Sequence, residues 1–202
     1  GFNVEKYEPS ERGSDWFANE SLDFRGHLRP AAGLVATYSY RPLGLFKENG
    51  NVLASTVRNS FYIHPGASLV LFDRFRLAFN MPIQAGVDGH TGTVVRDGVP
   101  TTFIDPPNSG GLGDLRLSAD ARLLGVYGDP FTLAVGAQVF LPTGDEAQWA
   151  SDGKVRVRPR AMVAGDIDIF TYAASAGVHV RTRHETFGPG QIGTEFNLTA
   201  AA

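Results

Sequence analysis

The 202 residues predict an all-β protein, an antiparallel up-and-down transmembrane β-barrel of about eight strands. Three observations lead to this prediction. Apolar and polar residues alternate with period two along most of the chain, short and long connections alternate between the predicted strands, and helical periodicity is almost absent. A longer parent protein would have room for further strands.

Eight segments are expected as strands because each alternates in this way and is bounded by turn-forming residues. In chain order they are 32–46, 52–71, 75–87, 112–124, 131–142, 153–165, 169–182 and 192–201. No run approaches the roughly 18 apolar residues that a membrane helix needs, whereas a barrel strand needs only about 9 to 11 alternating residues.

The alternation is clearest in 112–124 and 131–142. The first segment has an apolar face of Leu115, Leu117, Ala119, Ala121 and Leu123. Its other face carries Asp114, Arg116, Ser118, Asp120 and Arg122. The second segment sets Phe131, Leu133, Val135, Ala137, Val139 and Leu141 against Thr132, Ala134, Gly136 and Gln138. Such dense charge must meet water, and such a continuous apolar face must meet lipid or an oily core.

The other strands divide in the same way into an apolar and a polar face. Their polar faces carry Tyr62, His64 and Ser68; Arg76, Asn80 and Gln84; Lys154, Arg156, Arg158 and Arg160; Ser175, His179 and Arg181; and Glu195, Asn197 and Thr199. The predicted connections are sorted by length. Tight turns at 72–74, 127–130 and 166–168 alternate with longer stretches at 47–51, 88–111, 143–152 and 183–191, as in outer-membrane barrels.

One barrel domain is expected over 31–202, preceded by an irregular segment at 1–30 that would be either a plug in the lumen or part of the periplasmic rim. The chain begins at Gly1 without a signal peptide, which we expect to have been removed or left out. The net charge of −3 gives no reason to expect a nucleic-acid partner, and the absence of cysteine excludes disulfides and thiolate sites.

Aromatic residues cluster near the tight turns, at Phe72, Phe75, Tyr127, Phe131, Phe170 and Tyr172. Most of them are in phase with the apolar face. In a barrel they would form a girdle at the periplasmic interface, where amphipathic rings lie among the headgroups; otherwise they are hydrophobic corner residues.

Two stretches resemble the amino-terminal barrel of OmpA-family outer-membrane proteins of the myxobacterial type. They are Gly111-Leu-Gly-Asp-Leu-Arg-Leu-Ser-Ala-Asp-Ala-Arg-Leu123 and Gly128-Asp-Pro-Phe-Thr-Leu-Ala-Val-Gly-Ala-Gln-Val-Phe-Leu-Pro-Thr-Gly144. The opening Phe2–Phe17 and the block Ser151–Arg160 are similar to that group as well.

This resemblance implies a partial chain from a Gram-negative outer membrane. Its parent would bind peptidoglycan through a periplasmic domain that this chain lacks, so no residue here is assigned to that activity. The end at Ala200-Ala201-Ala202 also lacks the terminal aromatic residue that barrel assembly usually reads.

The charged polar face would line the barrel interior. The candidate lumen residues are Arg76, Asp114, Arg116, Asp120, Arg122, Lys154, Arg156, Arg158, Arg160, His179, Arg181 and Glu195. One interpretation is a pore that favours small anionic solutes. The other, which the narrow interior of an eight-stranded barrel favours, is that these charges pair and make a closed lumen rigid.

The leading functional hypothesis is a structural outer-membrane protein with lipids as its surroundings and no catalytic activity, cofactor or metal. No histidine pair has metal-ligand spacing, and no nucleophile elbow is present. The alternatives are a porin-like channel or transporter with a basic lumen, a soluble lipocalin-like barrel with its apolar faces turned inward, and lastly an outer-membrane enzyme.

Overall fold

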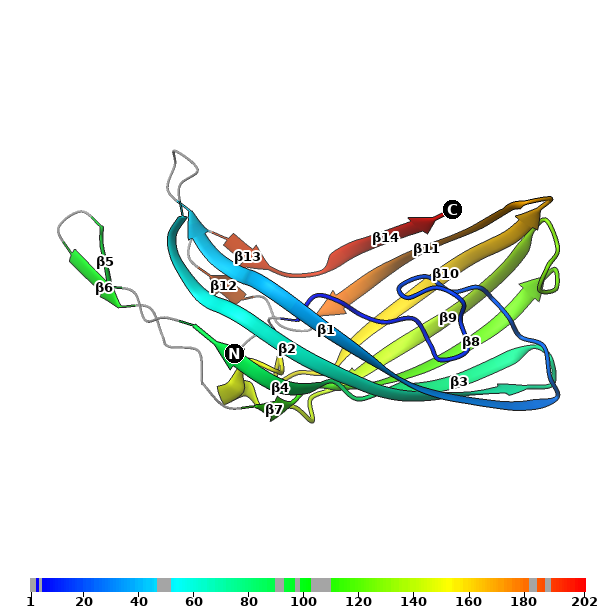
Figure 1. Ribbon diagram of the computed structural model, residues 1–202, viewed down its shortest axis with the longest axis horizontal. Helices are drawn as coiled ribbons and strands as arrows, with labels where there is room; N and C mark the ends of the chain where they lie inside the picture. The colour runs from blue at the N-terminus through cyan, green and yellow to red at the C-terminus, as the bar shows by residue number, and fades with distance from the viewer. Residues whose placement is uncertain are drawn as a thin grey trace.

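The computed structural model describes residues 3, 5–46, 52–89, 93–96, 99–102, 110–181, 185–187 and 190–202. In this part of the chain the fold is all-β, with a ten-stranded antiparallel sheet and two separate two-stranded hairpins (Figure 1). A short 3-10 helix, η1 (Glu146–Gln148), is its one helical element. The predicted all-β antiparallel class is confirmed. Among the described residues, no helix has the length and apolar character needed to cross a membrane.

The main sheet consists of β1 (Leu28–Phe46), β2 (Val52–Leu71), β3 (Phe75–Asn80), β4 (Ile83–Asp88), β7 (Gly111–Leu112), β8 (Leu115–Leu124), β9 (Thr132–Leu141), β10 (Arg156–Ile167), β11 (Phe170–Arg181) and β14 (Glu195–Ala201). Their order is β14-β11-β10-β9-β8-β3-β2-β4-β7, and β1 pairs with the other edge of β2. All these pairings are antiparallel.

Two of the eight predicted strands are interrupted. The segment 75–87 forms β3 and β4, which both pair with β2 and are separated by Met81 and Pro82. Proline has no N–H to donate to a ladder, which accounts for the break. The segment 112–124 likewise forms β7 and β8, separated by Gly113 and Asp114. When β3 with β4 and β7 with β8 are each taken as one interrupted strand, every predicted strand has a counterpart in the sheet.

The tight turns lie at one end of the sheet and the longer connections at the other (Figure 1). Phe72 and Asp73 have φ values of 53° and 55°, as the two central residues of a type I′ hairpin turn require. The longer connections contain the hairpins β5 (Thr93–Arg96) with β6 (Val99–Thr102) and β12 (Glu185–Phe187) with β13 (Gly190–Ile192). The predicted loop 47–51 and parts of 88–111 and 183–191 lie outside the described residues.

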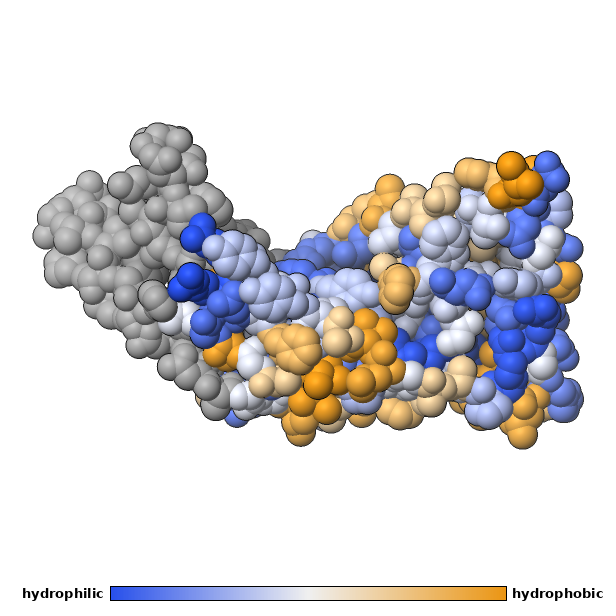
Figure 2. Space-filling view, viewed as in Figure 1, coloured by the Kyte–Doolittle hydropathy of each residue, from blue (hydrophilic) through white to orange (hydrophobic). Residues whose placement is uncertain are grey.

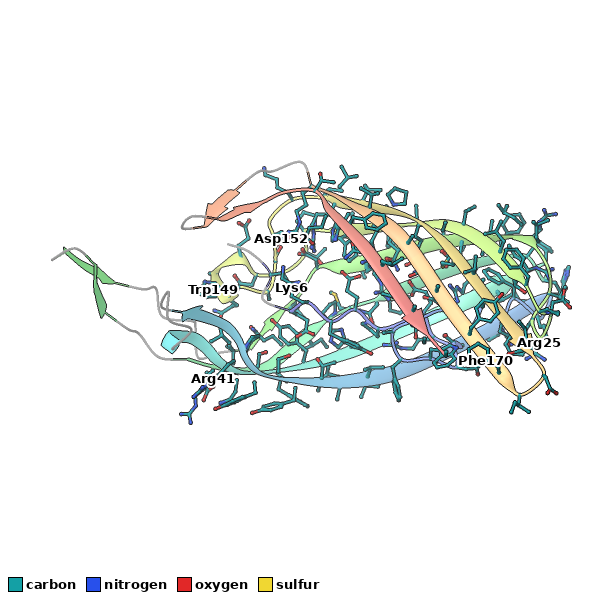
Figure 3. The ribbon with its side chains drawn as sticks, turned by 90° about the horizontal axis from the view of Figure 1, so that it is seen from above. Lys6, Arg25, Arg41, Trp149, Asp152 and Phe170 are labelled. Carbon is teal, nitrogen blue, oxygen red and sulfur yellow. The ribbon has the colours of Figure 1, made fainter. Side chains whose placement is uncertain are left out.

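The main sheet curls strongly, and residues 5–27 run as an irregular chain along its concave face (Figures 1 and 3). We call these residues the N-terminal segment. The role of this segment, as a plug in a lumen or as part of a periplasmic rim, stays a prediction. In the described part of the chain, the edge strands β1 and β14 each pair with one neighbour.

The two faces of the sheet have opposite polarity. Buried polar side chains of the sheet include Ser60, His64, Ser68, Arg76, Asn80, Gln84, Arg116, Ser118, Asp120, Thr132, Gln138, Arg156 and His179. Exposed large apolar side chains include Leu34, Phe61, Leu77, Phe79, Leu117, Val135, Val157, Val178 and Phe196. Figure 2 shows apolar residues gathered on the outer surface over β1 and β2. Soluble proteins place charged residues outside and apolar residues inside, so this polarity is inverted.

A small apolar core joins the N-terminal segment to the sheet near the tight turns. Leu22 and Phe24 of the segment are fully buried there, and Trp16 packs against the same cluster. The sheet contributes Val70, Ala134, Met162, Ala164 and Ala173. This core fixes the end of the segment that leads into β1.

Candidate functional site

The candidate site is the charged interior between the concave face and the N-terminal segment. Period two turns alternate residues of each strand toward it. The set comprises Arg76 from β3, Arg116 and Asp120 from β8, Arg156, Arg158 and Arg160 from β10, His179 and Arg181 from β11, Asp114 just before β8, and Glu195 at the start of β14.

Two residues predicted for the same interior lie outside its ion-pair network. Lys154 is exposed and precedes β10, because Gly153, with a φ of 66°, turns the chain before the strand begins. Arg122 is half-buried at the tight-turn end, where its Nη1 donates to the carbonyl oxygen of Gly125 at 2.5 Å. Lys154 therefore does not share the interior position of Arg156.

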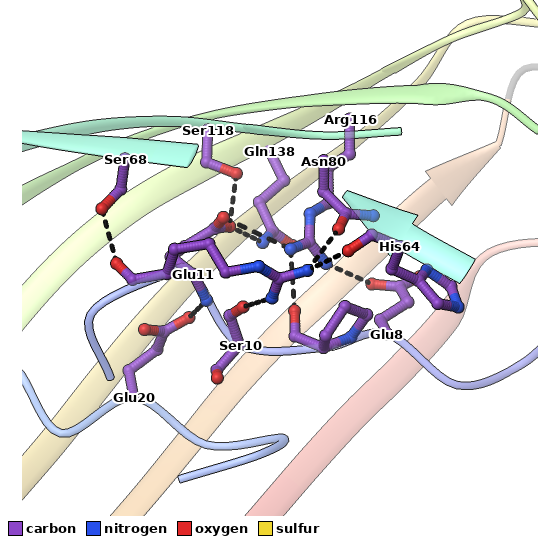
Figure 4. Close-up of polar contacts among 12 residues, drawn as sticks. Glu8, Ser10, Glu11, Glu20, His64, Ser68, Asn80, Arg116, Ser118 and Gln138 are labelled. Atoms are coloured by element: carbon purple, nitrogen blue, oxygen red, sulfur yellow. Dashed lines mark hydrogen bonds and ion pairs between the residues drawn. The ribbon is translucent and has the colours of Figure 1, made fainter. Parts of the chain in front are cut away.

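The carboxylate of Glu11 is the centre of the interior network (Figure 4). Ser118 Oγ and Gln138 Nε2 donate to its Oε1 at 2.6 and 2.9 Å, and Arg116 Nη2 donates to Oε2 at 3.3 Å. Burial by itself would raise the pKa of Glu11. Arg116, Arg160, Arg76 and the Ser118 hydrogen bond outweigh burial and lower the pKa to about 2. Glu11 is therefore a buried, ionised group that holds the segment against β8 and β9.

Arg12, the next residue of the segment, attaches it to β1, β2 and β3. Its guanidinium donates to the carbonyl oxygens of Gly33 and His64 and to Asn80 Oδ1. Gly33 and Gly66 face each other across β1 and β2. A Cβ at Gly33 would lie 3.1 Å from Arg12 Cδ, and a Cβ at Gly66 would lie 3.2 Å from Arg12 Nε. The two glycines thus leave the space that the arginine occupies.

A second buried cluster joins Glu20 of the segment to Asp120 of β8 through two arginines. Arg76 places Nη1 2.8 Å from Glu20 Oε2 and Nη2 2.7 Å from Asp120 Oδ2. Arg160 places Nη2 2.8 Å from Asp120 Oδ2 and Nη1 3.3 Å from Glu20 Oε1. Breaking a buried pair of this kind by removing one partner costs about 3–5 kcal/mol, because a charge is left uncompensated.

Further ion pairs extend the network toward the longer connections. Glu8 of the segment pairs with Arg158 and lies 3.8 Å from Arg116. The remaining pairs are Arg156 with Asp114 (2.8 Å) and Asp152 (2.9 Å), and Arg181 with Asp152 (2.5 Å) and Glu195 (3.4 Å). Arg76, Arg116, Arg156, Arg158, Arg160 and Arg181 are therefore each paired with at least one carboxylate.

A cavity of about 360 Å³ remains beside the N-terminal segment. Its lining includes Glu5 and Tyr7 of the segment, Arg158 of β10, His179 and Arg181 of β11, and Asn197 of β14. Burial raises the pKa of Glu5 to about 7, although the Tyr7 backbone N–H and Thr37 lower it in part. The lining also includes Asn80 of β3 and Arg116 of β8, so the cavity extends across the interior beside the paired arginines.

The two interior histidines belong to different parts of this site. His64 places Nε2 3.3 Å from Thr37 Oγ1, whereas the His179 ring stacks on Phe140 with centroids 5.0 Å apart. Among the described residues, no three His, Cys, Asp or Glu side chains are grouped so that they could hold a metal ion.

No family model matches this chain, and neither a curated protein nor a solved structure does. The resemblance to OmpA-family barrels remains a prediction.

Sequence reasoning missed the segment residues that complete the site, namely Glu8, Glu11, Arg12 and Glu20. A stretch around Pro9–Gly13 has the composition of a simple turn. The available signal was the charge of the polar faces, because arginines outnumber carboxylates there and buried arginines need partners.

Proposed function

We propose that this protein is a structural outer-membrane β-barrel protein whose sheet forms the barrel wall in a Gram-negative bacterium. The observation that supports this proposal best is the inverted polarity. Charged groups such as Arg76 and Asp120 are buried on the concave face, whereas Leu117 and Val135 are exposed on the outer face. A lipid bilayer is the solvent in which such a surface is stable.

The height of the apolar surface also fits a membrane. Along β1, ten residues separate Leu28 at the tight-turn end from Tyr38, which pairs with Phe61 of β2. At about 3.3 Å per residue and a strand tilt of about 40°, this run rises about 25 Å, the height of the apolar band of an outer-membrane barrel. Exposed aromatic rings stand at both limits, Tyr38 and Phe61 at one and Phe72 at the other.

The strand directions support closure into a barrel. Antiparallel pairing at every step from β1 to β14 leaves these two edge strands antiparallel to each other. They can therefore pair directly or through an even number of added strands. Closure removes the unpaired backbone groups that a bilayer does not tolerate.

A lipocalin-like soluble barrel is a poorer fit. It requires Leu117 and Val135 to be shielded and Arg156 to be exposed, the reverse of their observed burial. The proposal extends to the parent protein as an OmpA-like link between the outer membrane and peptidoglycan, for which this chain would be the membrane anchor.

The test is refolding from urea, with and without lipid vesicles. The expected result is co-flotation with the vesicles, a gel mobility that changes on heating, and β-rich circular dichroism in lipid. A folded monomer in buffer that lacks detergent and lipid would overturn the proposal.

A further inference from the structure

The arginines of the concave face outnumber its own carboxylates. In the described part of the sheet, six arginines take part in interior ion pairs: Arg76, Arg116, Arg156, Arg158, Arg160 and Arg181. Four carboxylates outside the N-terminal segment pair with them: Asp114, Asp120, Asp152 and Glu195. Six against four leaves two positive charges in excess, so an interior without the segment would be basic.

The N-terminal segment supplies carboxylates where that excess lies. Glu8 pairs with Arg158, Glu11 with Arg116 and Glu20 with Arg76 and Arg160. Together with Arg12 of the segment, these three carboxylates add two net negative charges, which balance the two excess arginines. The segment therefore matches the interior in charge and fills part of its cross-section (Figures 3 and 4).

The segment is fixed at one end and held by side chains along the rest. Among the described residues, its backbone-to-backbone hydrogen bonds to the sheet are confined to Gly26 and His27, which accept from Asp73 and Phe72. Leu22 and Phe24 are buried in the apolar core beside them. Residues 5–20 are attached mainly through the ion pairs and side-chain hydrogen bonds described above, and the cavity lies alongside them. This part can leave the interior without breaking a strand pairing.

We propose that residues 5–20 are a displaceable plug that closes an anion-conducting channel through the barrel. The proposal rests on the membrane-barrel function proposed above. An interior that accommodates a polypeptide segment is wide enough for a hydrated ion when that segment leaves. The exposed wall then carries two more positive than negative charges and selects small anions, such as chloride or small carboxylates, over cations.

The test compares variants of the full chain in planar bilayers under a potassium chloride gradient. In the variant E8Q/E11Q/E20Q the plug loses the charges that hold it. We expect the conductance to rise above that of the wild type, and the reversal potential to shift toward the chloride equilibrium potential. The single variant Glu8→Gln is measured as well, in case the triple variant misfolds, because Glu8 is the most exposed of the three carboxylates. It should show shorter channel openings than the triple variant and the same selectivity for anions. Asp168→Asn, at an exposed turn position, should stay as closed as the wild type.

A disulfide provides the converse test, because the sequence has no cysteine. A Cβ built at Gly13 lies 3.3 Å from the Cβ of Ala31 on β1, close to the separation in disulfides. Although the φ of 89° at Gly13 strains a cysteine there, cross-linking is checked directly by gel mobility. Added to the triple variant, G13C/A31C should silence the conductance until a reductant restores it.

Four results would overturn the proposal of a plug. The wild type could conduct as well as the triple variant, or the triple variant could insert without conducting. The conductance could also be selective for cations, or the disulfide-linked variant could still conduct. Vesicle flotation of the same samples identifies failure of the membrane proposal separately. A wild type that does not insert would refute that proposal, and the channel with it.

Discussion

Replacing Val135 by arginine should destabilise the protein in lipid far more than its exposure suggests. Val135 lies on β9 with its side chain 39% exposed, and its neighbours in register are Ala121 and Ala161. It is four residues beyond Phe131, which places it about 10 Å above the aromatic belt, near the middle of a band about 25 Å tall. In water, a substitution at such a surface position would change stability by no more than about 0.5 kcal/mol.

In a bilayer, arginine near the midplane of a barrel's outer face costs about 2–4 kcal/mol, equivalent to a 30- to 700-fold change in the unfolding equilibrium. The matched control is Leu124→Arg at the tight-turn end of β8, where the same charge costs about 0–1 kcal/mol. Leu124 is also exposed and apolar.

The assay is urea unfolding in lipid vesicles, followed by the gel-mobility shift. The reasoning would be refuted if Val135→Arg and Leu124→Arg lowered the free energy of unfolding equally.

Three other predictions use the same titration. Glu11→Gln should lower the free energy of unfolding by about 3–5 kcal/mol, because Arg116 would lose a buried partner. The control Asp168→Asn, at an exposed position, should change it by less than about 0.5 kcal/mol. Equal effects of the two substitutions would contradict the role of Glu11. Because burial raises the pKa of Glu5 from 4.5 to about 7, the folded state binds this proton more tightly than the unfolded state, so stability should fall as the pH rises between those values. Glu5→Gln should remove that fall, and a rise in its place would show the sign to be wrong. Gly66→Ala should lower the free energy of unfolding by about 1–3 kcal/mol, since its Cβ would lie 2.9 Å from Phe79 O and 3.2 Å from Arg12 Nε. Gly86→Ala is the control, because a Cβ there has nothing within 4 Å. Similar losses of stability in both variants would count against the Arg12 contact.

The strands and their phase were predictable because period-two alternation is a local property. The apolar face of Leu115 and Leu117 and the polar face of Arg116 and Ser118 follow from neighbouring residues alone. The type I′ turn at Phe72 and Asp73 was expected as a tight connection but not as a type, because two non-glycine residues at positive φ are unusual. The break at Pro82 and the late start of β10 after Gly153 depend on single residues within otherwise regular alternation.

The docking of the N-terminal segment could not be predicted from a pattern. It depends on particular pairings, such as Glu11 with Gln138 and Arg12 with Asn80, between an irregular segment and distant strands. The sequence shows that buried arginines require carboxylates, but not which acidic residues meet them. The interior side chains of the strands were therefore predicted, whereas the residues of the N-terminal segment that pair with them were not.

The position of Glu11 also bears on the order in which the protein folds. Its partners Arg116, Ser118 and Gln138 lie 105, 107 and 127 residues further along the chain. Contacts between such distant residues form slowly, because a long loop must close before they stabilise anything. Glu11 has none of these partners until β8 and β9 are in place. We therefore expect the N-terminal segment, although it is synthesised before these strands, to become ordered after them.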